Sequence, residues 1–392
     1  MSKFVPYIIL FIISLIIIFL VVLSASAKAN SDFSLHYKFA LKLPDNVHVA
    51  HVLYYATIVG FSKVLPNASA MQANVLSMMI FMSPLLLLLF ALLKRAANGG
   101  MKDLPLGALA VSLFIMTPIL VFADNRFLTG YVTSTVWHSP TFHALRLFVL
   151  PVSLLALRTF IGGGYRDSGQ RVYFLLLAAC LMSLAILAKP SYAIALLPGL
   201  CLFALYRAWK RQPVDWGLLL FGMILPGAIL LLLQYLINYG SGDGEIQFGL
   251  FLSARQHVLS ATQIPLRIIL SLAFPLSVYM LYFSEARKYT YLNLSWLVCI
   301  VGLFCMYGFN VSGMRFRHAV FNWTAYSAAF ALMYATIQFL VEKHAVERRQ
   351  SPQVEASSKR PLSRRLLFVA AVFALHVMFG LIYLFLFHSY PV

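Results

Sequence analysis

Long apolar runs separated by short polar segments make up most of the 392-residue chain. A helix needs roughly 20 mostly apolar residues to cross a bilayer. Eleven runs of suitable length occur, at about 5–24, 70–93, 105–123, 141–161, 172–188, 190–208, 217–238, 265–283, 291–309, 319–341 and 366–388. The pattern predicts an all-α polytopic membrane protein with about 11 transmembrane helices, residues 1–392 forming one transmembrane domain.

Two shorter helices are predicted in residues 25–69, after the first span. Residues 32–43 carry apolar positions at helical spacing with Lys38 and Lys42 on the other face, and Pro44 ends the pattern. Residues 46–64 repeat it more weakly, with Lys63 near the end. Moderately apolar helices with lysines on one side are stable in the plane of a membrane interface. We therefore expect interfacial helices in the first outside loop.

Composition excludes a soluble fold, because 61% of the residues are hydrophobic and only 11% are charged. The net charge of +18 does not require a nucleic-acid partner. With the N-terminus in the cytoplasm and the spans alternating, most Lys and Arg residues fall in inside segments, as the positive-inside rule expects. The longest inside segment, 342–365, is rich in Ser, Pro and charge, which is typical of a flexible linker.

Polar residues able to transfer protons or hold phosphate gather on the outer side. Most of the ten histidines fall in the outside segments 25–69, 124–140, 239–264 and 310–318 or at the adjoining span ends. Loops are polar in any membrane protein, but the inside loops carry almost no histidine. The asymmetry favours an outward-facing site.

Asp32 is the main candidate for catalysis, because it follows the first span directly in a chain with only 12 acids. On a helix, Asp32 and His36 lie one turn apart and share a face. A positioned carboxylate can act as a general base, and His36 can orient it or relay a proton. The alternative is that Ser31 or Asp32 only caps the helix, with His36 an interfacial residue.

The candidate phosphate ligands are basic residues on the outer side, where the positive-inside rule disfavours them. Arg315 and Arg317 are spaced to share one face of an extended loop, and His318 adds a third donor. Lys189 lies in a very short connection between two spans. Contact with lipid head groups is the alternative for the arginines, and snorkelling is the alternative for Lys189.

Two further pairs belong to the second outside loop. Arg126 can pair with Asp124 or reach a substrate phosphate, and Asp124 can assist positioning. Trp137 and His138 can stack on and hydrogen-bond a sugar ring, or they can belong to the interfacial aromatic belt.

The layout resembles the GT-C superfamily of membrane glycosyltransferases. The resemblance rests on the span pattern, on Asp32 in the stretch 31–36, on the stretch 51–55, and on Asp124 in the second outside loop. The stretches 137–141 and 189–192 are also similar to features of bacterial members. The adjacent acidic pair that many members carry in the first loop is missing, so we expect no cofactor. The alternative that stays open is a divalent cation, bound at Asp124 without such a pair.

The resemblance implies an inverting glycosyltransferase of the bacterial inner membrane, with a cytoplasmic N-terminus and a periplasmic site. Its donor would be a polyprenyl-phosphate sugar and its acceptor a glycolipid or surface polysaccharide. Asp32 would be the general base. Two alternatives stay open: a transporter or flippase for a lipid-linked glycan, and a polymerase or ligase that joins lipid-linked oligosaccharides.

Overall fold

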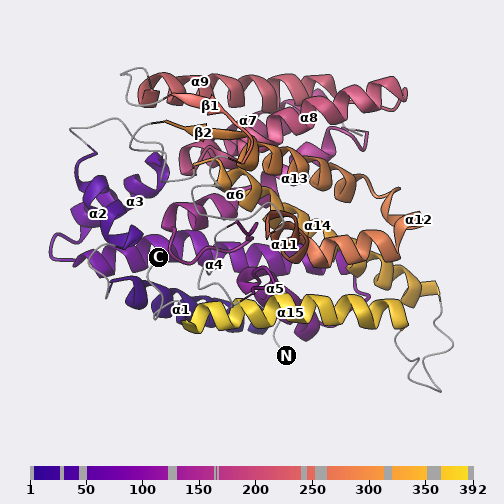
Figure 1. Ribbon diagram of the computed structural model, residues 1–392, viewed down its shortest axis with the longest axis horizontal. Coiled ribbons are helices and arrows are strands. Elements are labelled where there is room, and N and C mark those ends of the chain that lie inside the picture. The colour runs from indigo at the N-terminus through magenta and orange to yellow at the C-terminus, as the bar shows by residue number, and fades with distance from the viewer. Residues whose placement is uncertain are drawn as a thin grey trace.

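The computed structural model describes residues 4–26, 31–43, 51–121, 130–162, 165, 167–239, 245–251, 263–312, 320–350 and 363–386. Within these ranges, ten helical segments are long and apolar enough to cross a membrane. They lie side by side with their axes roughly along the long axis of the molecule (Figure 1). The multi-pass, all-α membrane architecture expected from the apolar runs is therefore confirmed.

The ten segments follow the predicted runs closely. They are α1 (Val5–Ser26), α4 (Ala70–Ala97), α6 (Pro140–Arg158), α7 (Ser168–Ala188), α8 (Ser191–Trp209), η2 (Leu218–Ile224) continuing into α9 (Leu225–Tyr239), α11 (Gln263–Leu281), α13 (Thr290–Gly308), α14 (Asn322–Gln350) and α15 (Arg364–Leu386). The π-helix η2 begins the sixth of these segments.

Helix α14 forms the centre of the bundle and contacts α13, α8, α6, α4 and α11. Its closest neighbour is α13. A Cβ atom on Gly302 of α13 would lie 3.0 Å from the Cα atom of Ala325, so the missing side chain lets the two backbones approach. The Thr324 hydroxyl donates to the Gly302 carbonyl oxygen at 2.9 Å across this contact. Close approach at small residues is a common way of packing helices in a bilayer, where no hydrophobic force drives them together.

The third predicted span, 105–123, is wrong as a continuous helix. It begins as α5 (Asp103–Ile115), which has only 13 residues, and continues as extended backbone to Val121. Pro118 explains the break, because proline has no N–H and disfavours helical backbone in the residue before it. At least one predicted span is therefore interrupted within the bundle.

Side chains satisfy the backbone carbonyls at the broken end of α5. Arg146 of α6 is fully buried and donates through Nη2 to Phe114 O (3.0 Å) and Leu113 O (3.3 Å). Thr135 and Ser134 donate to Phe114 O and Met116 O. Irregular backbone is tolerated at membrane depth only where protein groups or water replace its lost hydrogen bonds.

A second junction joins the extended segment after α5 to α11 and α15. His376 of α15 bridges two backbones: its Nδ1 lies 2.7 Å from Thr117 O, and its Nε2 lies 3.4 Å from Phe274 N. The Phe274 N–H is a donor, so Nε2 accepts and Nδ1 carries the proton. The Ile119 N–H donates to Leu270 O of α11 at 3.3 Å. Pro275 of α11 lies beside this exchange and disturbs the regular helix pattern there.

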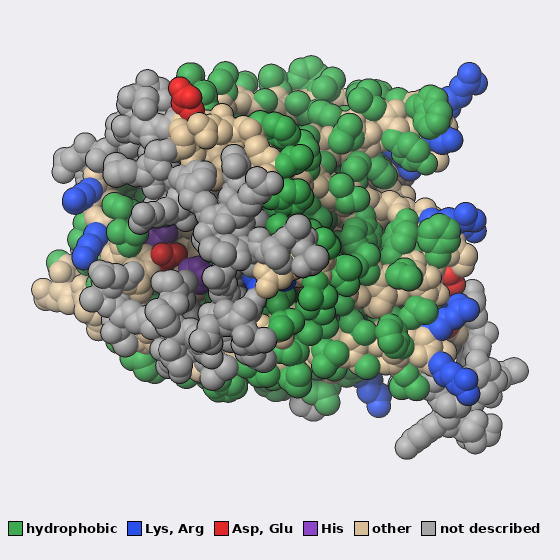
Figure 2. Space-filling view, in the orientation of Figure 1, with side chains coloured by type: hydrophobic (Ala, Val, Ile, Leu, Met, Phe, Trp, Pro, Cys, Tyr) green, Lys and Arg blue, Asp and Glu red, His purple; other side chains and the backbone are tan. Residues whose placement is uncertain are grey.

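The two ends of the bundle differ. The short helices α2 (Asp32–Leu41) and α3 (Val52–Val64) lie at one end, called the α2–α3 end from here on (Figure 1). The strands β1 (Ile246–Phe248) and β2 (Phe309–Val311) pair in antiparallel register on the same side of the molecule. The four-residue helix α12 (Phe283–Ala286) lies at the opposite end, where Lys and Arg side chains gather (Figures 1 and 2).

The prediction of a flexible linker over 342–365 is wrong for the first part of that segment. Helix α14 continues through residue 350, and α15 begins at Arg364. Ion pairs hold this extension, since Lys343 Nζ lies 3.1 Å from Glu285 Oε1 and 3.2 Å from Glu347 Oε1. Residues 351–362 lie outside the described part of the chain.

Candidate functional site

Lys189 occupies the turn between α7 and α8 and is buried, with 6% of its surface exposed. Its ammonium lies 3.5 Å from the centroid of the Trp323 ring, at the start of α14. It also donates to the Thr141 hydroxyl at 3.2 Å and reaches the Ser139 hydroxyl at 3.5 Å. The π face and the hydroxyl oxygens favour the charged ammonium, whereas burial disfavours it. The snorkelling interpretation is therefore wrong, because Lys189 points into protein.

Asp32 is the first residue of α2, and its neighbour Ser31 is the N-cap. The Ser31 hydroxyl accepts a hydrogen bond from the Ser34 N–H at 3.2 Å. The acidic group in the first turn also suits the positive end of the helix dipole. Ser31 thus takes the capping role that the sequence left open between the two residues.

His36 lies one turn beyond Asp32 and is partly buried. Its Nδ1 lies 2.7 Å from the hydroxyl oxygen of Tyr55 in α3, and its ring meets the His51 ring edge to face at 5.7 Å. Next to it, the Tyr54 hydroxyl donates to Asn74 of α4 at 2.6 Å. These bonds fix α2 and α3 on the bundle and hold the His36 ring in one orientation.

Electrostatic interactions connect Lys189 with both Asp32 and His36. Burial lowers the pKa of Lys189 to about 7, and the negative charge of Asp32 opposes this shift. Burial, and then the Lys189 charge, lower the pKa of His36 to about 3, so His36 is neutral at neutral pH. Burial and then Asp32 raise the pKa of Tyr55. The fold therefore brings a carboxylate, a neutral imidazole and a titratable amine together from α2 and the α7–α8 turn.

His138 belongs to the same neighbourhood, but Trp137 does not. The His138 ring lies 6.4 Å from the Trp323 ring, and its Nδ1 lies 3.4 Å from the Tyr383 hydroxyl oxygen. Trp137 is completely buried and stacks on His143 at a ring distance of 5.4 Å. The expectation that Trp137 stacks on a sugar is wrong for this structure, because its ring packs inside the bundle.

Two aromatic residues of this region were missed by the sequence analysis. Trp323 covers Lys189, and Tyr383 of α15 lies near His138 and interacts electrostatically with Asp32. Nothing in the local sequence marks either one, since both lie within long apolar spans. Ser139 and Thr141 did belong to the stretch 137–141 that carried the family resemblance, but their contact with Lys189 was not foreseen.

The other candidates fall outside the described residues. These are Asp124, Arg126, Arg315, Arg317 and His318. Their proposed roles stay predictions. Within the described ranges, no group of three or more His, Cys, Asp or Glu side chains is placed to hold a metal ion.

Acidic and histidine side chains lie together toward the α2–α3 end of the molecular surface (Figure 2). A carboxylate at this end can accept a proton from a bound hydroxyl group. A neighbouring ammonium can stabilise negative charge on a phosphate. The site thus combines a carboxylate with an ammonium group.

No known protein family matches the chain, and no curated protein shows significant sequence similarity to it.

Proposed function

We propose that the protein is a membrane glycosyltransferase of GT-C type. It moves a sugar from a polyprenyl-phosphate donor to a glycolipid or surface-polysaccharide acceptor on the outer face of the membrane. Asp32 is the general base in this proposal, and Lys189 binds the donor phosphate.

The observation that carries the proposal is the convergence of Asp32 and Lys189 at one end of a membrane-spanning bundle. The two residues are far apart in the sequence, yet the negative charge of Asp32 acts on the buried Lys189 amine. Burying an amine is costly, and structures tolerate it chiefly where the charge has a use. A lysine kept half-protonated near neutral pH beside a carboxylate suits binding of an anionic leaving group next to a base.

The reaction would proceed by single displacement. The acceptor hydroxyl transfers its proton to the Asp32 carboxylate while its oxygen attacks the anomeric carbon from the face opposite the phosphate. The bond between that carbon and the phosphate oxygen breaks, and the polyprenyl phosphate leaves with the bonding electrons. One carboxylate is sufficient, and the configuration at the anomeric carbon inverts.

Several further residues have proposed roles in this scheme. Arg315, Arg317 and His318, with Arg126, are proposed to share the growing charge on the phosphate with Lys189. Asp124 is proposed to help position the substrate. His36 would keep the carboxylate oriented, as a positioning residue rather than an acid, because it stays neutral.

The proposed outward orientation rests on charge. More of the described Lys and Arg side chains lie at the end opposite α2 and α3 than at the α2–α3 end (Figure 2), and positive residues favour the cytoplasmic side. We therefore propose a cytoplasmic N-terminus and a site on the periplasmic side of a bacterial inner membrane.

An Asp32→Asn variant tests the assignment. With polyprenyl-phosphate sugar as donor, kcat should fall by about 10²–10⁴-fold, the usual contribution of a general base, while donor binding survives. Asp103→Asn is the matched control. Asp103 pairs with Lys94 near the opposite end of the bundle, at 2.8 Å, in a partly exposed salt bridge, so transfer should stay unchanged.

The same variant distinguishes the transporter alternative. A flippase that only binds the lipid-linked glycan would lose little on replacement of one outer carboxylate. Unimpaired sugar transfer by the Asp32→Asn variant would sink the proposed role of Asp32.

A further inference from the structure

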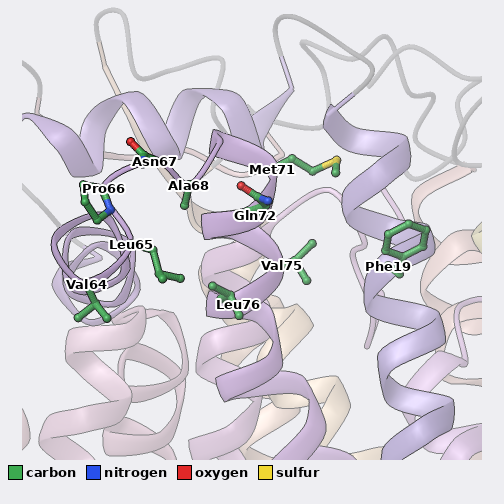
Figure 3. Close-up of a pocket in the computed structure, with 10 residues that line it drawn as sticks. All are labelled: Phe19, Val64, Leu65, Pro66, Asn67, Ala68, Met71, Gln72, Val75 and Leu76. Carbon is green, nitrogen blue, oxygen red and sulfur yellow. The ribbon is translucent and has the colours of Figure 1, made fainter.

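A shallow groove lies on the outer surface of the bundle, lined by α1, the end of α3 and the start of α4. Its volume is about 580 Å³, within the range of roughly 300–1,000 Å³ that small-molecule sites occupy. The end of α3 and the turn after it line the groove on the side of α4 that lies away from Phe19 (Figure 3). Phe19 of α1 and Val75 of α4 line it from the two spanning helices.

Two amide side chains lie at one end of the groove, and the rest of its lining is apolar. Asn67 and Gln72 line it near the start of α4, where that helix meets the α2–α3 end. One turn deeper, Val75 and Leu76 supply only hydrocarbon. This gradient matches a lipid whose head group lies at the interface and whose chain points into the bilayer.

Charge near the end of α3 favours an anionic lipid. Lys63 is exposed in the last turn of α3, directly before Val64, which lines the groove. A lysine near the membrane surface attracts anionic head groups. The bordering helices α1 and α4 are both apolar spans, and Phe19 is 51% exposed, so hydrocarbon can reach the groove sideways.

Helix α3 connects this groove to the candidate site. Tyr55, near the start of α3, is hydrogen-bonded to His36. Val64, at the end of α3, lines the groove. Nine residues separate them, which on an α-helix is about 14 Å. A lipid held in the groove can therefore extend its head group along α3 toward Asp32.

We infer that the groove between α1 and α4 binds the hydrocarbon chain of a phosphate-bearing lipid, and that this lipid is the anchored acceptor of the transfer reaction. The acceptor role of this lipid rests on the proposed function, whereas the binding of the lipid in the groove does not. The donor's phosphate has a different place, at Lys189.

Lipid binding is tested first, without any sugar chemistry. The full-length protein is placed in vesicles that contain phosphatidylglycerol with a photoactivatable diazirine in its acyl chain. In the wild-type protein, labelling of the α4 peptide around Val75 should exceed labelling of α9 around Leu232 at least fivefold. Leu232 is the reference because it is apolar, lipid-facing and 57% exposed. Equal labelling of the two peptides would overturn the inference.

A groove-filling variant gives the second measurement. Val75→Trp should reduce labelling of the groove about fivefold and leave α9 labelling unchanged, whereas Leu232→Trp should leave the groove signal intact. Lys63→Gln should lower the signal with the phosphatidylglycerol probe but not with a phosphatidylcholine probe. A groove signal that does not change in Val75→Trp counts against a defined site.

The acceptor role is tested with total membrane lipid extract as the acceptor pool and a panel of radiolabelled polyprenyl-phosphate sugars as donors. Val75→Trp should slow transfer about tenfold at low extract and recover the wild-type rate at saturating extract. An unchanged rate at low extract would remove the acceptor role, leaving Asp32 untouched. An active Asp32→Asn variant would instead remove the proposed function, whatever happens at the groove.

Discussion

Lys189 lies among groups that favour opposite charge states. Burial favours the neutral amine, whereas the Trp323 ring, the Thr141 hydroxyl and the nearby Asp32 favour the ammonium. The balance leaves its pKa at about 7, well below the ordinary value for lysine. Lys189 is therefore charged below neutral pH and loses its charge as the pH rises through 7.

Donor binding should follow this titration. We expect the KM for a polyprenyl-phosphate sugar to rise about tenfold between pH 6 and 8.5, because the neutral amine no longer attracts the phosphate. The donor is a phosphodiester with no ionisation in this range, and His36 has a pKa of about 3, so neither produces the step. Steady-state kinetics at varied pH measure it.

Lys189→Arg is the control for this pH dependence. The pKa of arginine lies above 12, so it stays charged from pH 6 to 8.5. The rise in KM should therefore vanish while donor binding persists. A wild-type KM that stays flat from pH 6 to 8.5, or a step that survives in Lys189→Arg, would show that Lys189 does not bind the phosphate.

His376 has a structural role at the residue scale. We expect His376→Leu to cost about 1–3 kcal/mol of stability, the usual penalty for leaving buried hydrogen-bonding groups without partners. The groups are Thr117 O and Phe274 N–H. His376→Asn keeps a donor near the position of Nδ1 and should lose less. Unfolding in detergent, followed by circular dichroism, measures the difference.

Leu375→Ala provides the matched control on the same helix. Leu375 is 41% exposed on the lipid-facing side, so its truncation should change the unfolding free energy by less than about 0.5 kcal/mol. Equal losses in Leu375→Ala and His376→Leu would mean that the bridge to α5 and α11 adds no stability.

At the scale of elements, α15 is placed by its contact with the broken end of α5. A Cβ atom on Gly380 would overlap the Ile115 carbonyl oxygen and lie 3.0 Å from the Met116 Cα atom. Residues 376, 380 and 383 share one face of α15 at helical spacing. That face meets the α5 junction through His376 and Gly380, and it brings Tyr383 to His138.

Gly380→Ala should therefore destabilise the protein. Inside a helix, alanine is normally more stable than glycine by about 0.5–1 kcal/mol, so the expected effect has the opposite sign. The added methyl group pushes α15 away from α5 and moves Tyr383 away from His138. We expect a lower melting temperature and reduced transfer activity.

Gly107→Ala is the comparison. Gly107 lies inside α5, and a Cβ atom there would have its nearest neighbour at 3.9 Å, in Leu10. That variant should be as stable as the wild type or more so. If Gly380→Ala also melts no lower than the wild type, the backbone contact between α15 and α5 does not fix the position of the last helix.

At the scale of the whole molecule, the distribution of charge predicts its orientation. The α2–α3 end should face outward, and the end with the gathered Lys and Arg side chains should face the cytoplasm. In a variant without the four native cysteines, Lys38→Cys should react with a membrane-impermeant maleimide in intact cells. Lys210→Cys should react only after permeabilisation.

Lys38 and Lys210 suit this comparison because both are exposed, one on α2 and the other directly after α8. The reversed labelling pattern would place Asp32 in the cytoplasm and remove the basis for an extracytoplasmic glycosyltransferase.

The local pattern of residues predicted much of the fold. Ten of the eleven predicted spans are helices of spanning length. Helix α2 (Asp32–Leu41) begins at the predicted residue and ends two residues before the predicted end of 32–43. Pro118 marks the place where the helix cannot continue, but the apolar run from 105 to 123 is long enough to predict a full span. Half of the candidate site residues lie outside the described part of the chain, so their roles stay predictions. They are Asp124, Arg126, Arg315, Arg317 and His318.

The sequence by itself determined that the chain spans a membrane many times, because hydrophobicity along a segment decides whether that segment enters a bilayer. It also determined the charge difference between the two ends. Only the tertiary structure decided that Lys189 turns inward to Trp323, that Trp137 is buried, and that Tyr383 reaches His138. Such contacts depend on how distant helices pack and rotate against one another, and no local pattern of residues records that.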